Sequence, residues 1–366
     1  MLRALALAEA ALRVVAPNPA VGCVITDASG ERVLGSGQTQ RAGGPHAEVM
    51  ALRDAQQQGH SVAGATAWVT LEPCSHHGRT GPCCDALVAA GIGKVVASLA
   101  DPNPLVAGQG FERLRAAGVA VEVGPGAEAS RELNIGFFSR MIRRRPWLRM
   151  KSAASLDGKT ALPNGTSQWI TGEAARTDGH AWRARAGVIL TGVGTVLEDN
   201  PRLDVRLVDT PRQPHLVLVD SHLQTPPDAA IFMPGREVWI YAANPNNERA
   251  AALRARGATI SYMANAHGKV DLAALLDDLA AREVNEVHAE AGHKLNGSLL
   301  REGLVDELLL YLAPKLLGEG LDIASRLHAG GPLERLDGAL ALEFRDVGRV
   351  GPDLRILARI AGRSSF

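Results

Sequence analysis

The sequence has no excess of charge of either sign, because 39 lysines and arginines balance 39 aspartates and glutamates. Proteins that bind nucleic acid or an anionic membrane usually have a basic excess, so neither partner is expected. No apolar run approaches the roughly 18 residues of a membrane span, which argues against a transmembrane helix. The apolar start, from Met1 to Glu9, resembles a short signal peptide, but Glu9 and Arg13 interrupt it and fit an amphipathic helix. We therefore expect a cytoplasmic protein.

Cysteine is also scarce, with only Cys23, Cys74, Cys83 and Cys84 present. Three of the four lie within eleven residues and close to histidines. In a chain of 366 residues this spacing favours a metal site in a reducing compartment over a disulfide framework. Cys23 and Cys84 are expected to be small buried residues.

The length and the patterns predict two α/β domains. Strands alternate with helices in the first part, which indicates a mostly parallel sheet with helices on its faces. The run Arg143-Arg144-Arg145-Pro146 marks a boundary after which the pattern restarts, giving domains 1–145 and 146–366. The predicted helices are 45–58, 83–90, 111–117 and 271–279; the predicted strands are 21–25, 67–71, 94–99, 119–123, 187–191, 215–219, 237–241, 258–262 and 286–290, with a closing pair at 308–312 and 340–344.

A metal site is predicted between His46 and Cys84. The segment begins with His46-Ala47-Glu48 and continues with Pro73-Cys74 and a further cysteine, Cys83. One histidine nitrogen and two thiolates leave the fourth position of a tetrahedral Zn2+ ion free for water, as catalytic zinc sites require. Zinc lowers the pKa of that water, and Glu48 can carry protons to the ring nitrogen and the leaving amine. The pattern is typical of zinc deaminases; a structural zinc closed by His76 or His77 is the alternative.

The loop between the two cysteines indicates the class of substrate. Eight residues separate Cys74 from Cys83, whereas many deaminases have two. The loop from Ser75 to Pro82 is polar and cationic, which suits a substrate with an anionic group such as a phosphate. An ordinary surface loop would also be polar.

The second half contains weaker patterns. It lacks a G-x-G-x-x-G motif after a strand, so a Rossmann dinucleotide site is not indicated. The segment from Thr191 to Thr195 could approach a phosphate, although short glycine pairs are usually turns. Arg183 and Arg206 could pair with a substrate phosphate, and solvated arginines are the default interpretation.

Two sets of motifs in the same order make the chain resemble the bifunctional riboflavin-biosynthesis deaminase–reductases over nearly its whole length. The first half contributes Pro17–Cys23, His46–Glu48, Glu72–His76 with Cys83, and Asp101–Pro104; the second contributes Lys151–Thr160, Ser167–Thr171, Gly194–Val196 with Asp199 and Pro201, and Lys294–Gly297.

This resemblance implies a cytidine-deaminase-like three-layer α/β domain followed by a dihydrofolate-reductase-like α/β domain. It implies zinc-dependent deamination of a diaminopyrimidinone that carries a ribosylamino 5-phosphate, and then NADPH-dependent reduction of the ribosyl group to ribityl. By the same mapping His46, Cys74 and Cys83 hold the zinc and Glu48 is the proton shuttle. NADPH would contact Ala154, Trp169, Thr195, Asp199, Ser221, Gly292, His293, Lys294, Leu295, Asn296, Gly297 and Ser298, and the reductase substrate would contact Ser167, Arg183, Leu203, Arg206 and Glu290.

One departure falls near the expected cofactor phosphates. The family usually has a Glu-Gly-Gly-type stretch where this chain reads Glu290-Ala291-Gly292-His293. The helix that follows Gly292 can still offer backbone amides to an anion.

Two other functions are compatible with the zinc motif. One is a nucleic-acid or free-base zinc deaminase with an appended nucleotide-binding domain, which the zero net charge opposes. The other is a non-catalytic structural-zinc module fused to a nucleotide-binding sensor domain, which requires four protein ligands. We expect a phosphorylated pyrimidine as the small-molecule partner, and a homo-oligomer.

Overall fold

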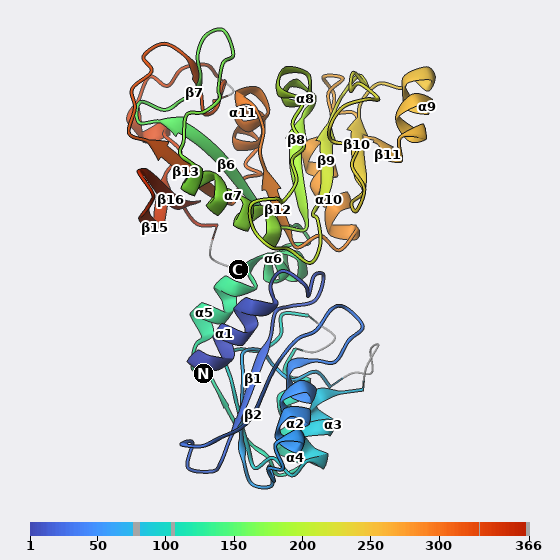
Figure 1. Ribbon diagram of the computed structural model, residues 1–366, viewed down its shortest axis with the longest axis vertical. Coiled ribbons are helices and arrows are strands. Elements are labelled where there is room, and N and C mark those ends of the chain that lie inside the picture. Colours follow the sequence, from blue (N-terminus) through green and yellow to red (C-terminus); the bar gives the residue numbers. More distant parts are fainter. Residues whose placement is uncertain (76–80, 104–106, 329, 364–366) are drawn as a thin grey trace. The chain divides into compact units, whose positions relative to one another are not determined.

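The computed structural model describes residues 1–75, 81–103, 107–328 and 330–363. The chain divides into two compact units, Met1–Arg144 (unit 1) and Arg145–Phe366 (unit 2) (Figure 1). In the described residues, none of the helices is both long and apolar enough to cross a membrane.

Unit 1 contains a five-stranded sheet in the order β2-β1-β3-β4-β5. The strands β3, β4 and β5 are parallel, whereas β1 pairs antiparallel with both β2 and β3. The sheet is therefore mixed, and the expectation of a mostly parallel one is wrong at β1 and β2. The strands are β1 (Gly22–Thr26), β2 (Val33–Gln38), β3 (Thr66–Val69), β4 (Lys94–Ala97) and β5 (Ala120–Val123); the helices are α1 (Leu2–Ala11), α2 (Ala47–Gln57), α3 (Cys83–Ala89), α4 (Gln109–Ala116), α5 (Ala127–Leu133) and α6 (Ile135–Arg143).

Strand β2 is the strand of unit 1 that the sequence did not reveal, and helices α5 and α6 were not predicted either. Its residues, Val-Leu-Gly-Ser-Gly-Gln, lack the β-branched alternation of an evident strand. The two glycines have a packing role, because a Cβ on Gly35 would lie 2.4 Å from the Ala51 carbonyl oxygen and one on Gly37 would lie 2.5 Å from the Ala51 nitrogen. They let α2 lie directly against the sheet, which fixes the position of the helix that begins after His46.

The opposite face of the same sheet is covered by α1. A Cβ on Gly22 would lie 1.9 Å from the Ala4 carbonyl oxygen, so this helix also approaches the strands closely. Side chains of adjacent residues in a strand point to opposite faces. Glycines on both faces of the β1–β2 pair therefore allow helices on both sides, and unit 1 has three layers (Figure 1).

Unit 2 contains a nine-stranded sheet in the order β11-β10-β9-β8-β12-β6-β13-β16-β15. The pairings from β11 to β13 are parallel, and those of β16 with β13 and β15 are antiparallel. The strands are β6 (Trp147–Ser155), β7 (Lys159–Ala161), β8 (Val188–Gly192), β9 (His215–Val219), β10 (Val238–Ala242), β11 (Ala258–Tyr262), β12 (Glu286–Ala289), β13 (Glu307–Ala313), β14 (Leu321–Asp322), β15 (Leu342–Val350) and β16 (Asp353–Ile360); the helices are α7 (Glu173–Arg185), α8 (Val193–Asp199), α9 (Asn247–Ala255), α10 (Leu272–Ala281) and α11 (His293–Arg301), with a 3-10 turn at Leu336–Gly338. Strands β7 and β14 form a separate antiparallel pair.

The predicted closing pair of strands is wrong in its pairing. Segments 308–312 and 340–344 belong to β13 and β15, but β16 lies between them and pairs with both. The sequence places β15 and β16 on either side of a tight turn at Gly351 and Pro352, which makes them hairpin neighbours. Because β16 pairs on its other side with β13, β15 is at the edge of the sheet.

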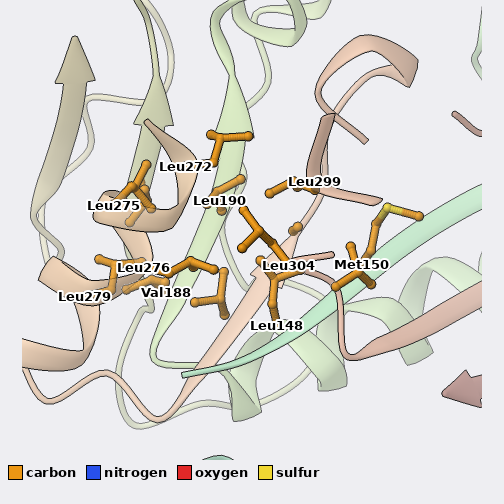
Figure 2. Close-up of a cluster of buried hydrophobic side chains, with 14 of the residues drawn as sticks. Leu148, Met150, Val188, Leu190, Leu272, Leu275, Leu276, Leu279, Leu299 and Leu304 are labelled. Atoms are coloured by element: carbon orange, nitrogen blue, oxygen red, sulfur yellow. The ribbon is translucent and has the colours of Figure 1, made fainter. Parts of the chain in front are cut away.

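The apolar core of unit 2 lies between the parallel strands and the helices α10 and α11. Figure 2 shows leucines of α10 directed toward Val188 and Leu190 of β8, with Leu148 and Met150 of β6 nearby. These residues are nearly all fully buried. Burial of each such side chain stabilises the fold by about 1.5–3 kcal/mol, which makes this cluster the rigid base for the strand ends.

Charged residues are buried near the amino-terminal ends of β6, β12 and β13. The Arg149 guanidinium donates to Glu286 at 2.8 Å and to Glu307 at 2.6 Å. Arg185 supplies a second cation to Glu286 at 2.9 Å, and Arg359 supplies a second cation to Glu307 at 3.1 Å. Burial alone would raise the pKa of Glu286, but the charges of Arg185 and Arg149 hold it at about 2. Because every charge is paired, the network is compatible with a dry interior.

Candidate active sites

The three predicted zinc ligands come together in unit 1. His46 is the residue before α2, Cys83 is the first residue of α3, and Cys74 lies in the segment that follows β3. The His46 Nδ1 atom is 3.2 Å from Cys83 Sγ and 3.5 Å from Cys74 Sγ, and all three ligand atoms lie within 4.8 Å of one another. The Cys83 backbone N–H also donates to Cys74 Sγ at 3.3 Å.

This geometry fits a tetrahedral zinc ion. Zn–N and Zn–S bonds of about 2.0 and 2.3 Å place neighbouring ligand atoms roughly 3.5–3.8 Å apart, close to the separations found here. One imidazole and two thiols are also ligands that zinc prefers. The alternative fourth ligands, His76 and His77, lie outside the described residues, as does most of the loop predicted to face an anionic substrate.

Glu48 lies beside this ligand set and is 3% exposed, in the first turn of α2. Burial and the negative charge of Cys74 raise the pKa of Glu48 to about 7. A carboxyl group with that pKa can both accept and release a proton near neutral pH, which is the property that general acid–base catalysis requires.

The other two cysteines have no place among the ligands. Cys23 is buried in β1, and Cys84 is buried beside Cys83. The Cys84 thiol donates to the Pro73 carbonyl at 3.1 Å. A hydrogen bond from the Cys83 thiol lowers the pKa of Cys74 to about 4 and raises that of Cys83, and a divalent cation would favour both thiolates.

In unit 2 the chain leaves the two central strands of the parallel sheet, β8 and β12, toward opposite edges of the sheet. The chain proceeds from β8 to β9 on one side, and from β12 to β13 beyond β6 on the other. Ligands of open α/β sheets bind at such a point, outside the carboxyl ends of the strands. The helices α8 and α11 begin there, side by side, since a Cβ on Gly292 would lie 3.9 Å from Thr195 Oγ1 and one on Gly192 would lie 3.2 Å from Leu295 (Figure 1).

The residues mapped to NADPH contact fall partly into this crevice. Thr195 and the segment Gly292–Ser298 meet at the two helix starts. The Asn296 side chain donates to the Ile323 carbonyl at 3.0 Å, so it is engaged within the protein. The others lie on separate elements: Ala154 is buried in β6, Asp199 ends α8, Ser221 follows β9, and Trp169 is 62% exposed with the Arg176 guanidinium 4.5 Å from its ring centre.

Three of the five residues mapped to the substrate form one charged cluster. Glu290, directly after β12, accepts from Arg183 of α7 at 2.9 Å, and Arg183 also donates to the Asp204 carbonyl at 2.9 Å. The Asp204 carboxylate in turn binds Arg206 at 2.5 Å. The Arg183 charge holds the pKa of Glu290 well below its usual range. Within the described residues, neither Ser167 nor Leu203 joins this cluster through a side-chain hydrogen bond.

Three further side chains belong to this cluster and were not predicted from the sequence. Lys151 Nζ is 3.5 Å from Glu290, and His288 Nε2 is 3.2 Å from it. His180 accepts a hydrogen bond from the Arg206 backbone N–H at 3.1 Å. His180 and Arg183 are one helical turn apart, a weak signal that many surface helices share.

Comparison with known proteins gives matches to both units. Residues 1–99 match the cytidine and deoxycytidylate deaminase zinc-binding region, and residues 146–356 match the RibD C-terminal domain. The riboflavin biosynthesis protein RibD of Escherichia coli K12 is 44% identical over 97% of this chain and 96% of its own length. RibD of Aquifex aeolicus is 38% identical over 97% of this chain and 96% of its own length.

Solved structures give the same result. RibD of Acinetobacter baumannii is 38% identical, with a TM-score of 0.86 over 98% of this chain and 97% of its own. A diaminohydroxyphosphoribosylaminopyrimidine deaminase/5-amino-6-(5-phosphoribosylamino)uracil reductase from Thermotoga maritima is 32% identical. Its TM-score is 0.87 over 99% of this chain and 97% of its own. These matches confirm the predicted deaminase-like and reductase-like α/β folds, and the dependence on zinc and NADPH. The chain belongs to the RibD family of bifunctional deaminase–reductases of riboflavin biosynthesis.

Proposed function

We propose that unit 1 deaminates 2,5-diamino-6-(5-phosphoribosylamino)pyrimidin-4(3H)-one, and that unit 2 reduces the product, 5-amino-6-(5-phosphoribosylamino)uracil, with NADPH. The two domains would be 1–145, the zinc-dependent deaminase, and 146–366, the reductase. The observation that carries the proposal is the grouping of His46, Cys74 and Cys83 within 4.8 Å beside the buried Glu48.

In the deaminase, His46, Cys74 and Cys83 would hold the zinc. When bound, zinc supplies a Lewis acid that makes an attacking water more acidic. Glu48 would take a proton from that water and pass it to the ring nitrogen, and would then take the remaining hydroxyl proton of the tetrahedral adduct and pass it to the leaving amine. One water is consumed and one ammonia is released, and Glu48 returns to its starting state.

In the reductase, the backbone N–H groups at the start of α11, with Thr195 beside them, would bind the phosphates of NADPH. Ala154, Trp169, Asp199 and Ser221 would complete the cofactor contacts. When bound, NADPH supplies the hydride, and the protein has chiefly to position the acceptor carbon against it. Ser167, Leu203 and the cluster of Arg183, Arg206 and Glu290 would position the phosphorylated substrate.

The wider setting follows from the same family relationship. We propose a cytoplasmic enzyme with small-molecule substrates and with neither nucleic acid nor membrane as a partner. A nucleic-acid base deaminase is not favoured, because the similarity to RibD extends through both units.

We also propose a homo-oligomer assembled through β15. In the described part of the chain this nine-residue strand pairs on one side only, with β16, and most of its residues are exposed on both faces. Phe344 is 71% exposed, and Leu342 and Val347 are also exposed. Long edge strands with exposed apolar side chains are normally covered, and a second copy of the same strand would cover Leu342, Phe344 and Val347. Light scattering should give a mass above 38.6 kDa, and Phe344→Lys should lower it.

One assay tests both activities. The purified protein receives the phosphorylated diaminopyrimidinone, and ammonia release and the loss of NADPH absorbance are followed together. We expect both, with NADPH consumption dependent on prior deamination. Ammonia release without NADPH consumption would refute the reductase half, and the absence of both would refute the proposed substrate.

A further inference from the structure

The segment that contains Cys74 is held in place by side chains that are not themselves proposed zinc ligands. Glu72, two residues before Cys74, is 4% exposed. Its carboxylate accepts four backbone N–H bonds: from Asp101 at 3.1 Å, Gly108 at 2.9 Å, Gly110 at 2.9 Å and Phe111 at 3.3 Å. The last three of these residues lie at the start of α4, so Glu72 joins this helix to the end of β3.

The carbonyl groups around Cys74 are fixed as well. The Pro73 carbonyl accepts from the Cys84 thiol at 3.1 Å, and the Cys74 carbonyl accepts from the Cys84 backbone N–H at 3.2 Å. The Ser75 carbonyl accepts from Arg113 of α4 at 3.1 Å, and Arg113 is itself paired with Asp85 of α3. Three successive peptide groups therefore have a defined donor on α3 or α4.

The contact between α4 and this segment leaves no space. A Cβ on Gly110 would lie 2.1 Å from the Pro73 carbonyl oxygen and 3.0 Å from Glu72 Oε1. The Cys84 thiol, which also lies 3.5 Å from the Gly110 carbonyl, closes the same gap from the other side. Any other residue at position 110 would push α4 away from the ligand segment.

We propose that Glu72 is a positioning residue of the deaminase, and that with Gly110 and Cys84 it sets the place of Cys74 relative to His46 and Cys83. This inference rests on the proposed zinc site. Groups that orient metal ligands typically change metal affinity or activity by about 10–100-fold when they are mutated. Helix α4 contains no proposed ligand, and the inference gives it a function in the deaminase reaction.

The principal test is Glu72→Gln, which keeps the shape of the side chain but turns an N–H donor toward backbone N–H groups. We expect the zinc dissociation constant, measured by chelator competition, to rise about 10–100-fold. The absorption spectrum of the cobalt-substituted protein should change, because it reports the ligand geometry. The reductase activity of the same chain should stay within about twofold. Glu112→Gln, the same change on an exposed carboxylate of α4, is the matched control.

A second pair of variants tests the proposal independently of Glu72. Cys84→Ala removes the donor to the Pro73 carbonyl, and Cys84→Ser retains one. We expect tighter zinc binding in Cys84→Ser than in Cys84→Ala. Equal zinc affinity in these two variants would overturn the proposal, and so would wild-type zinc affinity with an unchanged cobalt spectrum in Glu72→Gln, even at a lower melting temperature.

The outcome for Cys74→Ser separates this inference from the proposed function. Zinc binding that survives Cys74→Ser would refute the metal site itself. Loss of zinc in Cys74→Ser together with normal zinc binding in Glu72→Gln would refute only the positioning role.

Discussion

The two units place their functional residues in different ways. In unit 1 the proposed catalytic groups come from three short segments, the start of α2, the residues after β3 and the start of α3, and each segment contains its own reactive side chain. In unit 2 the corresponding groups come one at a time from α7, α8, β12 and α11, and the sheet order brings them together. Metal chemistry needs particular ligand atoms, which leave a trace in the sequence. Hydride transfer needs mainly position, which many residue types can provide.

Glu48→Gln is the variant that should test this contrast with the largest effect. The amide cannot take up and release the proton that the carboxylate transfers, so deamination should fall by about a thousandfold. The reductase should be unaffected when it is given 5-amino-6-(5-phosphoribosylamino)uracil directly, because its residues lie in the other unit. Ammonia release and NADPH absorbance measure the two halves separately. Ammonia release at the wild-type rate would remove Glu48 from the proposed role.

The buried charges of unit 2 provide the second test. Arg149→Met leaves Glu286 and Glu307 each with one cation in place of two. Breaking such a buried network should destabilise unit 2 by about 3–5 kcal/mol. Chemical denaturation, monitored in each unit separately by hydrogen exchange, would measure this loss of stability. Arg335→Met, which breaks an exposed pair with Asp337, should change stability by less than about 0.5 kcal/mol. A comparable loss in both variants would contradict the role of burial.

Glu286 of unit 2 and Glu48 of unit 1 should make contributions to stability whose pH dependences have opposite signs. The pKa of Glu286 is lowered from 4.5 to about 2, so its stabilising contribution is complete above pH 4.5 and is lost as the pH falls toward 2. The pKa of Glu48 is raised from 4.5 to about 7, so without zinc the folded unit 1 retains a proton that the unfolded chain loses. The contribution of Glu48 to the stability of unit 1 should therefore fall as the pH rises from 4.5 to 7, whereas Cys74, whose pKa is lowered to about 4, contributes in the opposite sense. The changes from Glu286 and Glu48 should each be roughly 3 kcal/mol.

Calorimetry in a chelator, repeated across this pH range, would measure the two transitions. The difference in stability between the wild type and Glu48→Gln isolates the Glu48 contribution in unit 1, and it should fall by roughly 3 kcal/mol from pH 4.5 to 7, with unit 2 unchanged. A difference that stays constant across this range would show that Glu48 makes no such contribution.

The smallest expected effect concerns the cofactor crevice. A Cβ on Gly292 would meet only Thr195 Oγ1, at an ordinary 3.9 Å, so Gly292→Ala should leave the fold and its melting temperature unchanged. A methyl group at that place would nevertheless obstruct a phosphate, and NADPH should bind about tenfold more weakly, equivalent to about 1.4 kcal/mol. NADPH fluorescence titration would measure this, with Gly330→Ala, which has open space, as the control. Unchanged NADPH affinity would place the phosphates elsewhere.

The sequence allowed prediction of most strands in both units, but not of the helices α5–α9, nor of the groups that act indirectly. Strand β2 was missed because its glycines, needed for contact with α2, remove the alternation by which strands are recognised. The position of β15 was wrong because strand order depends on β16, which competes for the same partner. His180 and His288 were missed since a single imidazole has no distinctive neighbours along the chain, and Lys151 begins the motif Lys151–Thr160, which by itself assigns this residue to no site.

By itself the sequence determined the chemistry of unit 1: one imidazole, two thiols and a carboxyl group at spacings that few functions other than a zinc deaminase require. Only the tertiary structure decided how that chemistry is supported. Close approach through glycines fixes α2 and α4, and the four hydrogen bonds of Glu72 fix the segment of Cys74. It also decided the composition of the Glu290 cluster in unit 2. The physical reason is that reactivity belongs to individual side chains, whereas positioning depends on distances between residues far apart in the chain.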